Sequence, residues 1–196
     1  MKYATDLKFK GSRRYLQGGD IYNEIQDILS DTLGGFVSKL VFKRFARTQI
    51  ELLIGSPPYV ENPLGSGVVT SWSGEKVADF WFRETGREIS DSYPFEEDLI
   101  WNAIVISDQY IVSQRKNPYT PIENVISLTK KLNCELSPEI EGKWLFGQIE
   151  LECCLPEEWK EIKISRRSCI ANRFSRNTIC VDGCNIGEIQ FIVGRP

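Results

Sequence analysis

The stretch RRYLQGGDIYNEIQDIL, residues 13–29, decides how the chain begins to fold. Its apolar residues recur at helical spacing: Ile21, Ile25, Ile28 and Leu29. This period predicts an amphipathic helix from about Asp20 to Leu33. The glycines that follow it, Gly34 and Gly35, are typical of a helix C-terminus.

Two more glycines, Gly18 and Gly19, stand directly before the predicted helix. A glycine pair lets the backbone approach a bound group closely, and a helix start offers N–H donors without intrahelical acceptors. The pair is therefore either a strand-to-helix turn that needs positive φ or a cradle for an anion or oxyanion. In either case we expect Asp20 to act as the helix N-cap.

A second helix start is marked at Thr120, which is followed by Pro121 and Glu123. Ser or Thr at the N-cap, Pro at the first helical position and Glu at the third form a capping box. We interpret this motif as structural. The remaining segments are rich in β-branched and aromatic residues and end at glycine or proline turns, which predicts strands.

Strands are expected within five stretches: 5–16, 35–55, 68–86, 98–114, whose first few residues also fit a helix, and 142–194, with a hairpin at Asp182-Gly183. Residues 56–67 are expected to be a loop because they contain prolines and glycines. Trp72, Phe80 and Phe82 alternate and are expected on one buried face.

The two halves of the chain repeat one order of elements: a strand, a turn marked by Gly or Pro, an amphipathic helix, then antiparallel strands. The motif RFART at 44–48 is echoed by RFSRN at 173–177. We expect an α+β protein with two halves, residues 1–92 and 93–196, forming one compact unit.

Composition excludes several function classes. The chain has 196 residues, 24 basic and 27 acidic residues and a formal charge of −3, which argues against nucleic-acid binding. No apolar run reaches the length of a membrane span or a signal-peptide core, so we expect a cytoplasmic protein without membrane attachment. Histidine is absent, which excludes Ser-His-Asp, Cys-His and histidine-base chemistry.

The cysteines all lie in the C-terminal third, without a CxxC pair, at positions 134, 153, 154, 169, 180 and 184. We expect buried or idle thiols and no metal site. A redox pair of Cys180 and Cys184 is the alternative.

The stretch LQGGDIYNEIQDIL resembles the HGG helix start of hot-dog acyl-thioesterases, with Gln17 in place of the histidine. A long helix wrapped by an antiparallel sheet, present twice, is similar to a double hot dog in one chain. RFART and SRRSCIANRFSRN also resemble the leinamycin-type acyltransferase/decarboxylase family of polyketide assembly.

This resemblance implies an acyl-thioester enzyme that transfers, decarboxylates or hydrolyses acyl groups. Its substrates are carried by coenzyme A or an acyl carrier protein, with no other cofactor. The reaction of hot-dog dehydratases resembles a mechanism that uses a histidine together with a carboxylate. This chain has no histidine, so the resemblance does not extend to that reaction. The alternatives are a non-catalytic acyl-binding hot-dog protein and a structural, partner-binding α+β protein. We expect a monomer or a homodimer.

The candidate catalytic residues are Asp20, Tyr22 and Glu24, because carboxylates and tyrosine remain for proton transfer when histidine is absent. Tyr22 also fits a core position, and Asn23 fits either a carbonyl donor or a cap. The candidate substrate-binding residues are of three kinds: the residues before and at the helix start, Asn23, and arginines suited to phosphate. They are Gln17, Gly18, Gly19, Asn23, Arg44, Arg47, Arg173 and Arg176. The alternative for the four arginines is that they lie at a solvent-exposed strand edge, where their charge prevents edge-to-edge pairing.

Overall fold

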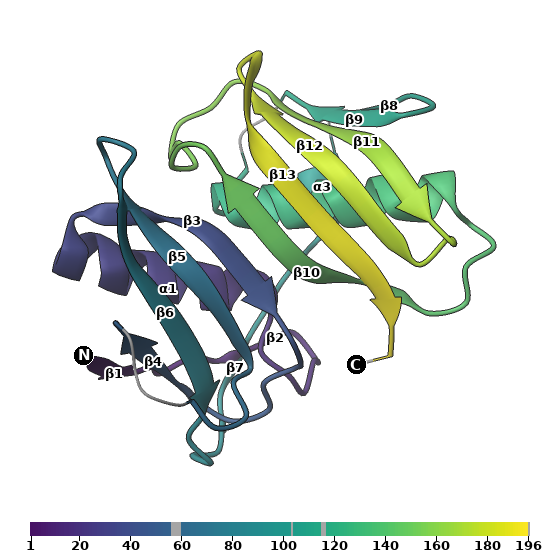
Figure 1. Cartoon of the computed structure of the whole chain (residues 1–196). Helices are drawn as coiled ribbons and strands as arrows, with labels where there is room; N and C mark the ends of the chain where they lie inside the picture. Colours follow the sequence, from purple (N-terminus) through teal and green to yellow (C-terminus); the bar gives the residue numbers. More distant parts are fainter. Residues whose placement is uncertain (56–59, 103, 115–116, 196) are drawn as a thin grey trace. The chain divides into compact units, whose positions relative to one another are not determined.

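The structure is a computed structural model that describes residues 1–55, 60–102, 104–114 and 117–195. The chain divides into two compact units, Met1–Phe95 and Glu96–Pro196. Each unit has a long helix of 16 residues against an antiparallel sheet (Figure 1). No helix in the described part of the chain is long and apolar enough to cross a membrane.

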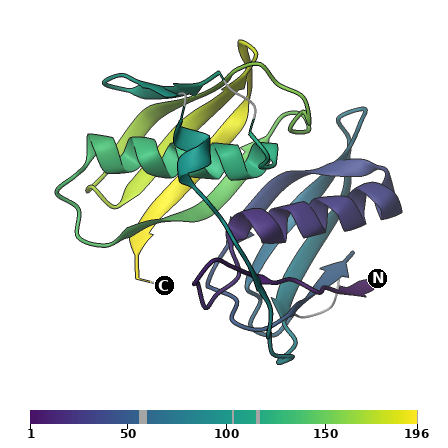
Figure 2. The same ribbon diagram turned by 180° about the vertical axis from the view of Figure 1, so that it is seen from behind.

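The first unit contains one long helix, α1 (Gly18–Leu33). Its strands are β1 (Lys2–Ala4), β2 (Phe9–Lys10), β3 (Gly35–Phe42), β4 (Ile50–Ile54), β5 (Gly65–Ser71), β6 (Lys76–Glu84) and β7 (Ser92–Tyr93). Five of them form an antiparallel array in the order β1-β4-β6-β5-β3, and β2 pairs with β7 in parallel. α1 packs on this sheet, with contacts to β3 (Figure 2).

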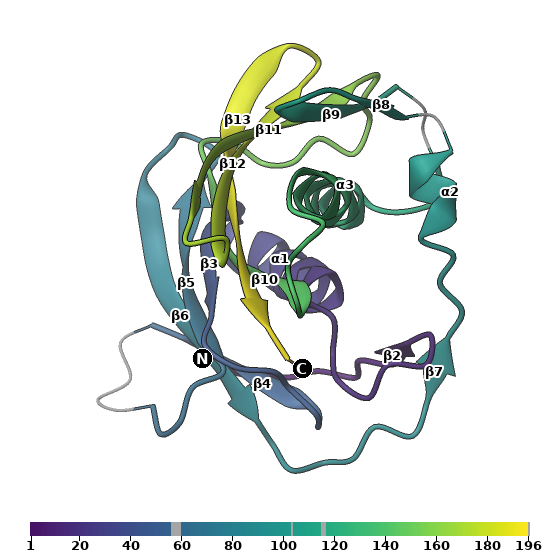
Figure 3. The ribbon, with the colours of Figure 1, turned by 90° about the vertical axis from the view of Figure 1, so that its right-hand side faces the viewer.

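The second unit has a short helix, α2 (Asp98–Trp101), and a long one, α3 (Pro121–Leu136). Its strands are β8 (Ile104–Ile106), β9 (Tyr110–Ser113), β10 (Lys143–Leu151), β11 (Ile162–Ile170), β12 (Phe174–Val181) and β13 (Cys184–Gly194). Their order is β10-β13-β12-β11-β9-β8, all antiparallel. α3 lies against one face of this sheet (Figure 3).

The cores lie between each helix and its own sheet. In the first unit Ile25 and Leu29 of α1 and Phe80 and Phe82 of β6 are fully buried. In the second unit α3 and five strands contribute fully buried apolar residues, among them Val125, Leu128, Leu132, Ile111, Ile149, Ile162, Ile164, Ile179 and Ile189. The apolar helical period thus produces a buried stripe in both helices.

Two predicted helix ends and one predicted hairpin turn agree with the structure. Gly34 ends α1 in the left-handed conformation, with φ 65°. Thr120 accepts a hydrogen bond from the Glu123 N–H, and the Glu123 carboxylate accepts from Thr120, so the capping box is confirmed. Asp182 and Gly183 both have positive φ in the β12–β13 hairpin, as a tight turn of this kind requires.

Three strand predictions are wrong in part. Residues 5–16 contain only the two-residue strand β2 and otherwise form loops. Residues 35–55 are neither one strand nor a hairpin, because β3 pairs with β5 and β4 with β6. RFART is a loop between β3 and β4. Trp72 lies in the turn between β5 and β6, where it is 61% exposed and stacks on Phe36 of β3, so its predicted burial is wrong. Phe80 and Phe82 are buried as expected.

The prediction that residues 56–67 form a loop is wrong at its C-terminal end, where β5 begins at Gly65. Residues 56–59 of this loop lie outside the described residues. So does Ala103 of the predicted strand 98–114. Gly65 and Gly67 belong to β5 and pair with Phe82 and Phe80 of β6. A Cβ atom at either glycine would overlap the facing phenylalanine ring and a backbone carbonyl. Glycine is therefore required here by the close approach of an aromatic ring, and not by a turn.

We predict that Gly67→Ala destabilises the protein by about 1–3 kcal/mol, because the added methyl group forces the Phe80 ring out of its place. Urea unfolding measures the loss. Ser66→Ala, a change at the neighbouring half-buried position of the same strand, is the control and should have little effect. Equal stability of the two variants would contradict this packing argument.

Candidate functional site at the start of α1

The helix α1 begins at Gly18, and its N-cap is Gln17 in extended conformation, with φ −79° and ψ 141°. The expectation that Asp20 is the N-cap is therefore wrong; it is the third helical residue. Gly18 and Gly19 are helical, so neither provides the positive-φ turn. The first intrahelical hydrogen bond runs from Ile21 N–H to Gln17 C=O, 3.1 Å. The N–H groups before it point out of the helix without intrahelical acceptors.

Gln17 differs from a usual N-cap because its side chain makes no capping hydrogen bond. Its Nε2 atom is buried and has no hydrogen-bond partner among the described residues. A buried donor without an acceptor is uncommon in folded proteins and calls for an explanation such as a ligand. The amide of Gln17 thus adds a side-chain donor beside the backbone donors of Gly18 and Gly19.

Asp20 lies in a buried cluster with Lys10 and Tyr93. The Lys10 Nζ and Asp20 Oδ1 atoms are 2.7 Å apart, and the two side chains are only 4% and 9% exposed. The Tyr93 hydroxyl donates to the same Oδ1 at 2.9 Å. The Lys10 ammonium also lies 4.5 Å from the centre of the Phe95 ring, which favours a cation.

The strands β2 and β7 hold this cluster in place. They pair in parallel, with Phe9 opposite Ser92 and Lys10 opposite Tyr93. Because successive side chains of a strand point to opposite faces, Lys10 and Tyr93 share one face. Phe9 and Ser92 share the other. The pair β2–β7 therefore separates the buried Asp20 cluster from whatever lies on its other side.

Burial raises the pKa of the Tyr93 hydroxyl above its usual range, and the negative charge of Asp20 raises it further. The phenol therefore remains a hydrogen-bond donor to Asp20 across the physiological pH range.

The other predicted catalytic residues lie along the same helix. Tyr22 is buried, with 2% of its surface exposed, in line with a core position. Asn23 and Glu24 are half-buried. Burial raises the pKa of the Glu24 carboxyl, and the charges of Asp27 and Asp6 raise it further, so Glu24 is a stronger base than an ordinary glutamate.

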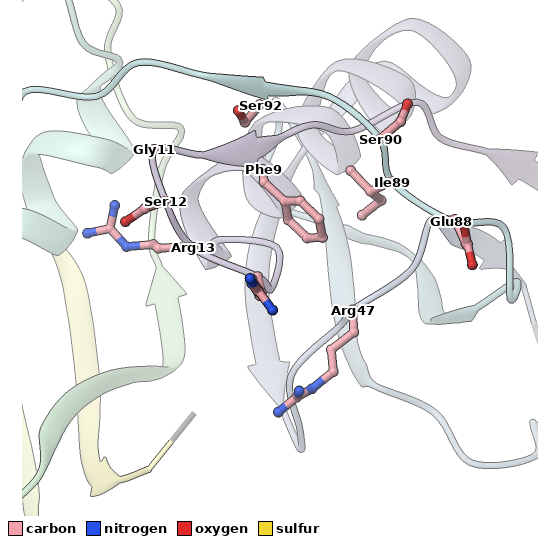
Figure 4. Close-up of a pocket in the computed structure, with 10 residues that line it drawn as sticks. Phe9, Gly11, Ser12, Arg13, Arg47, Glu88, Ile89, Ser90 and Ser92 are labelled. Carbon is pink, nitrogen blue, oxygen red and sulfur yellow. The ribbon is translucent and has the colours of Figure 1, made fainter.

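A pocket of about 460 Å³ opens on the side where Phe9 and Ser92 point. Phe9 and Ile89 lie together at its centre, with Arg13 on one side and Arg47 on another (Figure 4). Arg14 also lines it. The pocket thus combines an apolar centre with three guanidinium groups.

The loop that carries Arg47 is fixed to its neighbours. The Glu84 carboxylate accepts hydrogen bonds from the N–H groups of Arg47 and Thr48, at 2.6 and 3.0 Å. Leu16 N–H donates to Ala46 C=O at 2.8 Å. These bonds hold the Arg47 loop beside the segment that leads from Arg14 to Gln17.

The four predicted arginines differ in their surroundings, two in each unit. Arg47 lines the pocket, whereas Arg44 is turned to the Asn62 carbonyl, to which it donates. Arg173 and Arg176 are exposed in the second unit, and Arg176 pairs with Glu188 at 3.5 Å. Sequence reasoning missed Lys10, Tyr93, Arg13 and Arg14; for Arg13 and Arg14, proximity to the glycine pair was an available signal.

The cysteines are free thiols, and none is buried: Cys134, Cys153 and Cys184 are exposed, and the rest are intermediate. Of the expectation of buried or idle thiols, the buried alternative is wrong: Cys134 is exposed on α3, Cys153 and Cys154 follow the end of β10, and Cys169, Cys180 and Cys184 lie in strands β11, β12 and β13. Within the described residues, no group of three or more Cys, Asp or Glu side chains is arranged to hold a metal ion.

Comparison of the sequence with family models and with curated proteins finds no match. The structure is similar to solved polyketide-pathway domains. The pyran synthase domain from module nine of the sorangicin pathway has a TM-score of 0.55 and 10% identity, covering 100% of this chain and 93% of that one. The dehydratase domain of PpsC from Mycobacterium tuberculosis, in complex with C12:1-CoA, has a TM-score of 0.52 and 9% identity, covering 92% and 85%.

A trans-AT polyketide synthase dehydratase domain from Brevibacillus brevis has a TM-score of 0.52 and 8% identity, covering 99% of this chain and 94% of that one. At these identities the likeness concerns the fold alone. The chain has a hot-dog-like fold, with a long helix packed on an antiparallel sheet.

We predict that Asp20→Asn destabilises the protein by about 3–5 kcal/mol, because it leaves the buried Lys10 ammonium without its carboxylate. Lys10→Met should have a comparable effect. The double variant should lose clearly less than the sum of the single losses in urea unfolding; additive losses would contradict a direct ion pair.

The raised pKa of the Tyr93 hydroxyl leads us to predict that the stability of the fold depends on pH. The unfolded phenol releases its proton near pH 10, about the ordinary tyrosine value, whereas the folded one retains it. Above that pH the folded state binds more protons than the unfolded state, so stability falls as pH rises. Urea unfolding between pH 8 and about pH 11 should show a steeper loss for the wild type than for Tyr93→Phe. Parallel curves would disprove the role of Tyr93.

Proposed function

We propose that the chain is a double hot dog, one in each unit, that binds acyl thioesters of coenzyme A or an acyl carrier protein and transfers, decarboxylates or hydrolyses the acyl group. The repeat of a 16-residue helix and an antiparallel sheet in both units supports the double form. The dehydratase domain of PpsC, with the same kind of fold, was solved with an acyl-CoA. That complex supports the choice of an acyl thioester as the ligand.

The unpartnered amide of Gln17 at the start of α1 is the observation that carries this proposal. The thioester carbonyl accepts hydrogen bonds from Gln17 Nε2 and from the N–H groups of Gly18 and Gly19. These donors become stronger partners as the carbonyl oxygen gains negative charge during attack. The positive end of the helix dipole adds to the stabilisation of the same charge.

Glu24 is the proposed proton acceptor. In hydrolysis its carboxylate takes a proton from water as the water oxygen attacks the carbonyl carbon. The tetrahedral oxyanion then collapses, the C–S bond breaks, and the leaving thiolate takes up the proton that Glu24 holds, which restores the carboxylate. The raised pKa of Glu24 favours this role. Asp20, bound by Lys10 and Tyr93, positions the first turn of α1, and Tyr22 lies behind it in the core.

Acyl transfer or hydrolysis fits the chain better than dehydration, because these reactions need an oxyanion site and one carboxylate. Histidine is absent from the sequence, so no imidazole is present to remove a proton next to the carbonyl. The reaction product distinguishes these cases: free thiol and acid for hydrolysis, an acylated acceptor for transfer, and an enoyl thioester for dehydration.

A second candidate is a non-catalytic acyl-thioester-binding protein. It is favoured by the contacts of Asp20, whose Oδ1 already accepts from both Lys10 and Tyr93. In this case thioesters bind without turnover, and neither Glu24→Gln nor Glu24→Ala changes the affinity.

We predict that the purified protein releases thiol from a panel of acyl-CoA and acyl carrier protein thioesters. Gln17→Leu should lower the rate of release by about 10²-fold or more, because one oxyanion donor is lost. Mass spectrometry of the products and a thiol reagent measure the reaction.

The matched control is Thr120→Ala, which removes the N-cap of α3 and weakens that helix start by about 1 kcal/mol. It should leave thiol release unchanged, so that an effect of Gln17→Leu is assigned to the site and not to a weakened helix. Release that is equally fast in Gln17→Leu and wild type would disprove the proposed oxyanion site.

A further inference from the structure

We infer that the pocket around Phe9 binds the 3′-phosphorylated adenosine diphosphate head of coenzyme A. This inference rests on the proposed function and names coenzyme A, not an acyl carrier protein, as the thioester carrier. The pocket lies on the face of β2–β7 opposite the Asp20 cluster.

The charge of the pocket fits phosphate groups. Arg13, Arg14 and Arg47 line it, and Glu88 is the acidic residue beside them, in a chain whose net charge is −3. Within the described residues, neither the Arg14 nor the Arg47 guanidinium makes an ion pair or a hydrogen bond. Both groups are therefore available for bidentate bonds to phosphate oxygens.

Other arginines of the chain are already engaged. Arg83 pairs with Glu51 at 2.6 Å, Arg87 with Asp6 at 3.0 Å, and Arg167 with Glu188 at 2.7 Å. Arg14 and Arg47, which have no such partner within the described residues, line the same pocket.

The centre of the pocket fits a nucleobase. The Phe9 ring is half-buried and lies beside the Ile89 side chain (Figure 4). An aromatic ring with nearby guanidinium groups binds a base by stacking. The hydroxyl groups of Ser12, Ser90 and Ser92 also line the pocket and supply hydrogen bonds to ribose or phosphate.

The size of the pocket favours a small molecule over a protein partner. Its volume of about 460 Å³ lies in the range of ligand pockets, roughly 300–1,000 Å³. A carrier protein needs a broad contact surface, on the order of 800 Å² from each partner for a standard interface.

The pocket and the oxyanion donors are close along the chain. Only Tyr15 and Leu16 separate Arg14 from Gln17, so their Cα atoms are at most about 11 Å apart. The pantetheine arm is longer than this separation when extended, so a curved arm places the head at Arg14 and the thioester at the start of α1.

The test is titration calorimetry with adenosine 3′,5′-bisphosphate, which carries two of the phosphates of this head and no pantetheine. We expect binding by the wild type and an affinity about tenfold lower in Arg14→Gln and in Arg47→Gln, since each loses a charged hydrogen-bond donor. Arg44→Gln is the matched control, because Arg44 lies on the same loop and donates to Asn62 instead of lining the pocket. It should bind within twofold of wild type.

Absence of bisphosphate binding, or an equal loss in Arg44→Gln and Arg47→Gln, overturns the pocket assignment. Thiol release from an acyl-pantetheine, which has no nucleotide head, is measured in parallel. Release without bisphosphate binding leaves the proposed function standing and the inference refuted. Bisphosphate binding without release from any thioester refutes catalysis and leaves the nucleotide pocket standing.

Discussion

The ion pair between Lys10 and Asp20 is the interaction on which the candidate site depends. Both side chains are almost fully buried, so neither charge is stabilised by bulk water, and each requires the other. Asp20 belongs to α1 and Lys10 to β2, and Tyr93 adds a bond from β7. The first turn of α1 is thereby fixed to a pair of strands that lies outside the main sheet of its unit.

This arrangement gives the β2–β7 pair two different faces. One face carries Lys10 and Tyr93 and closes over the helix; the other carries Phe9 and Ser92 and opens into the pocket. A two-residue pairing is weak by itself, and the buried charge pair compensates for its shortness. Any ligand held by Phe9 and Arg14 is therefore connected, through β2, to the turn that carries Gln17, Gly18 and Gly19.

The sequence predicts the parts of this site that depend on local pattern. Helical spacing located α1, a left-handed glycine located its end, and the capping box located α3, because each signal is contained within a few residues. Asp20 was misassigned as a cap because its actual partners are Lys10 and Tyr93, the latter 73 positions away. Glycines of β5 were read as loop because the rings that require them belong to another strand.

The two long helices show why α1, and not α3, carries the candidate site. At the start of α3 the Thr120 hydroxyl accepts from Glu123 N–H, and the Glu123 carboxylate accepts from Thr120. Asn124, fully buried in the first turn, exchanges hydrogen bonds with Asn117. The polar groups of this helix start are thus occupied by the protein itself. Gln17 provides no such side-chain cap for α1, and its amide donor is buried. The start of α1 therefore differs from that of α3 in leaving a side-chain donor without a partner among the described residues.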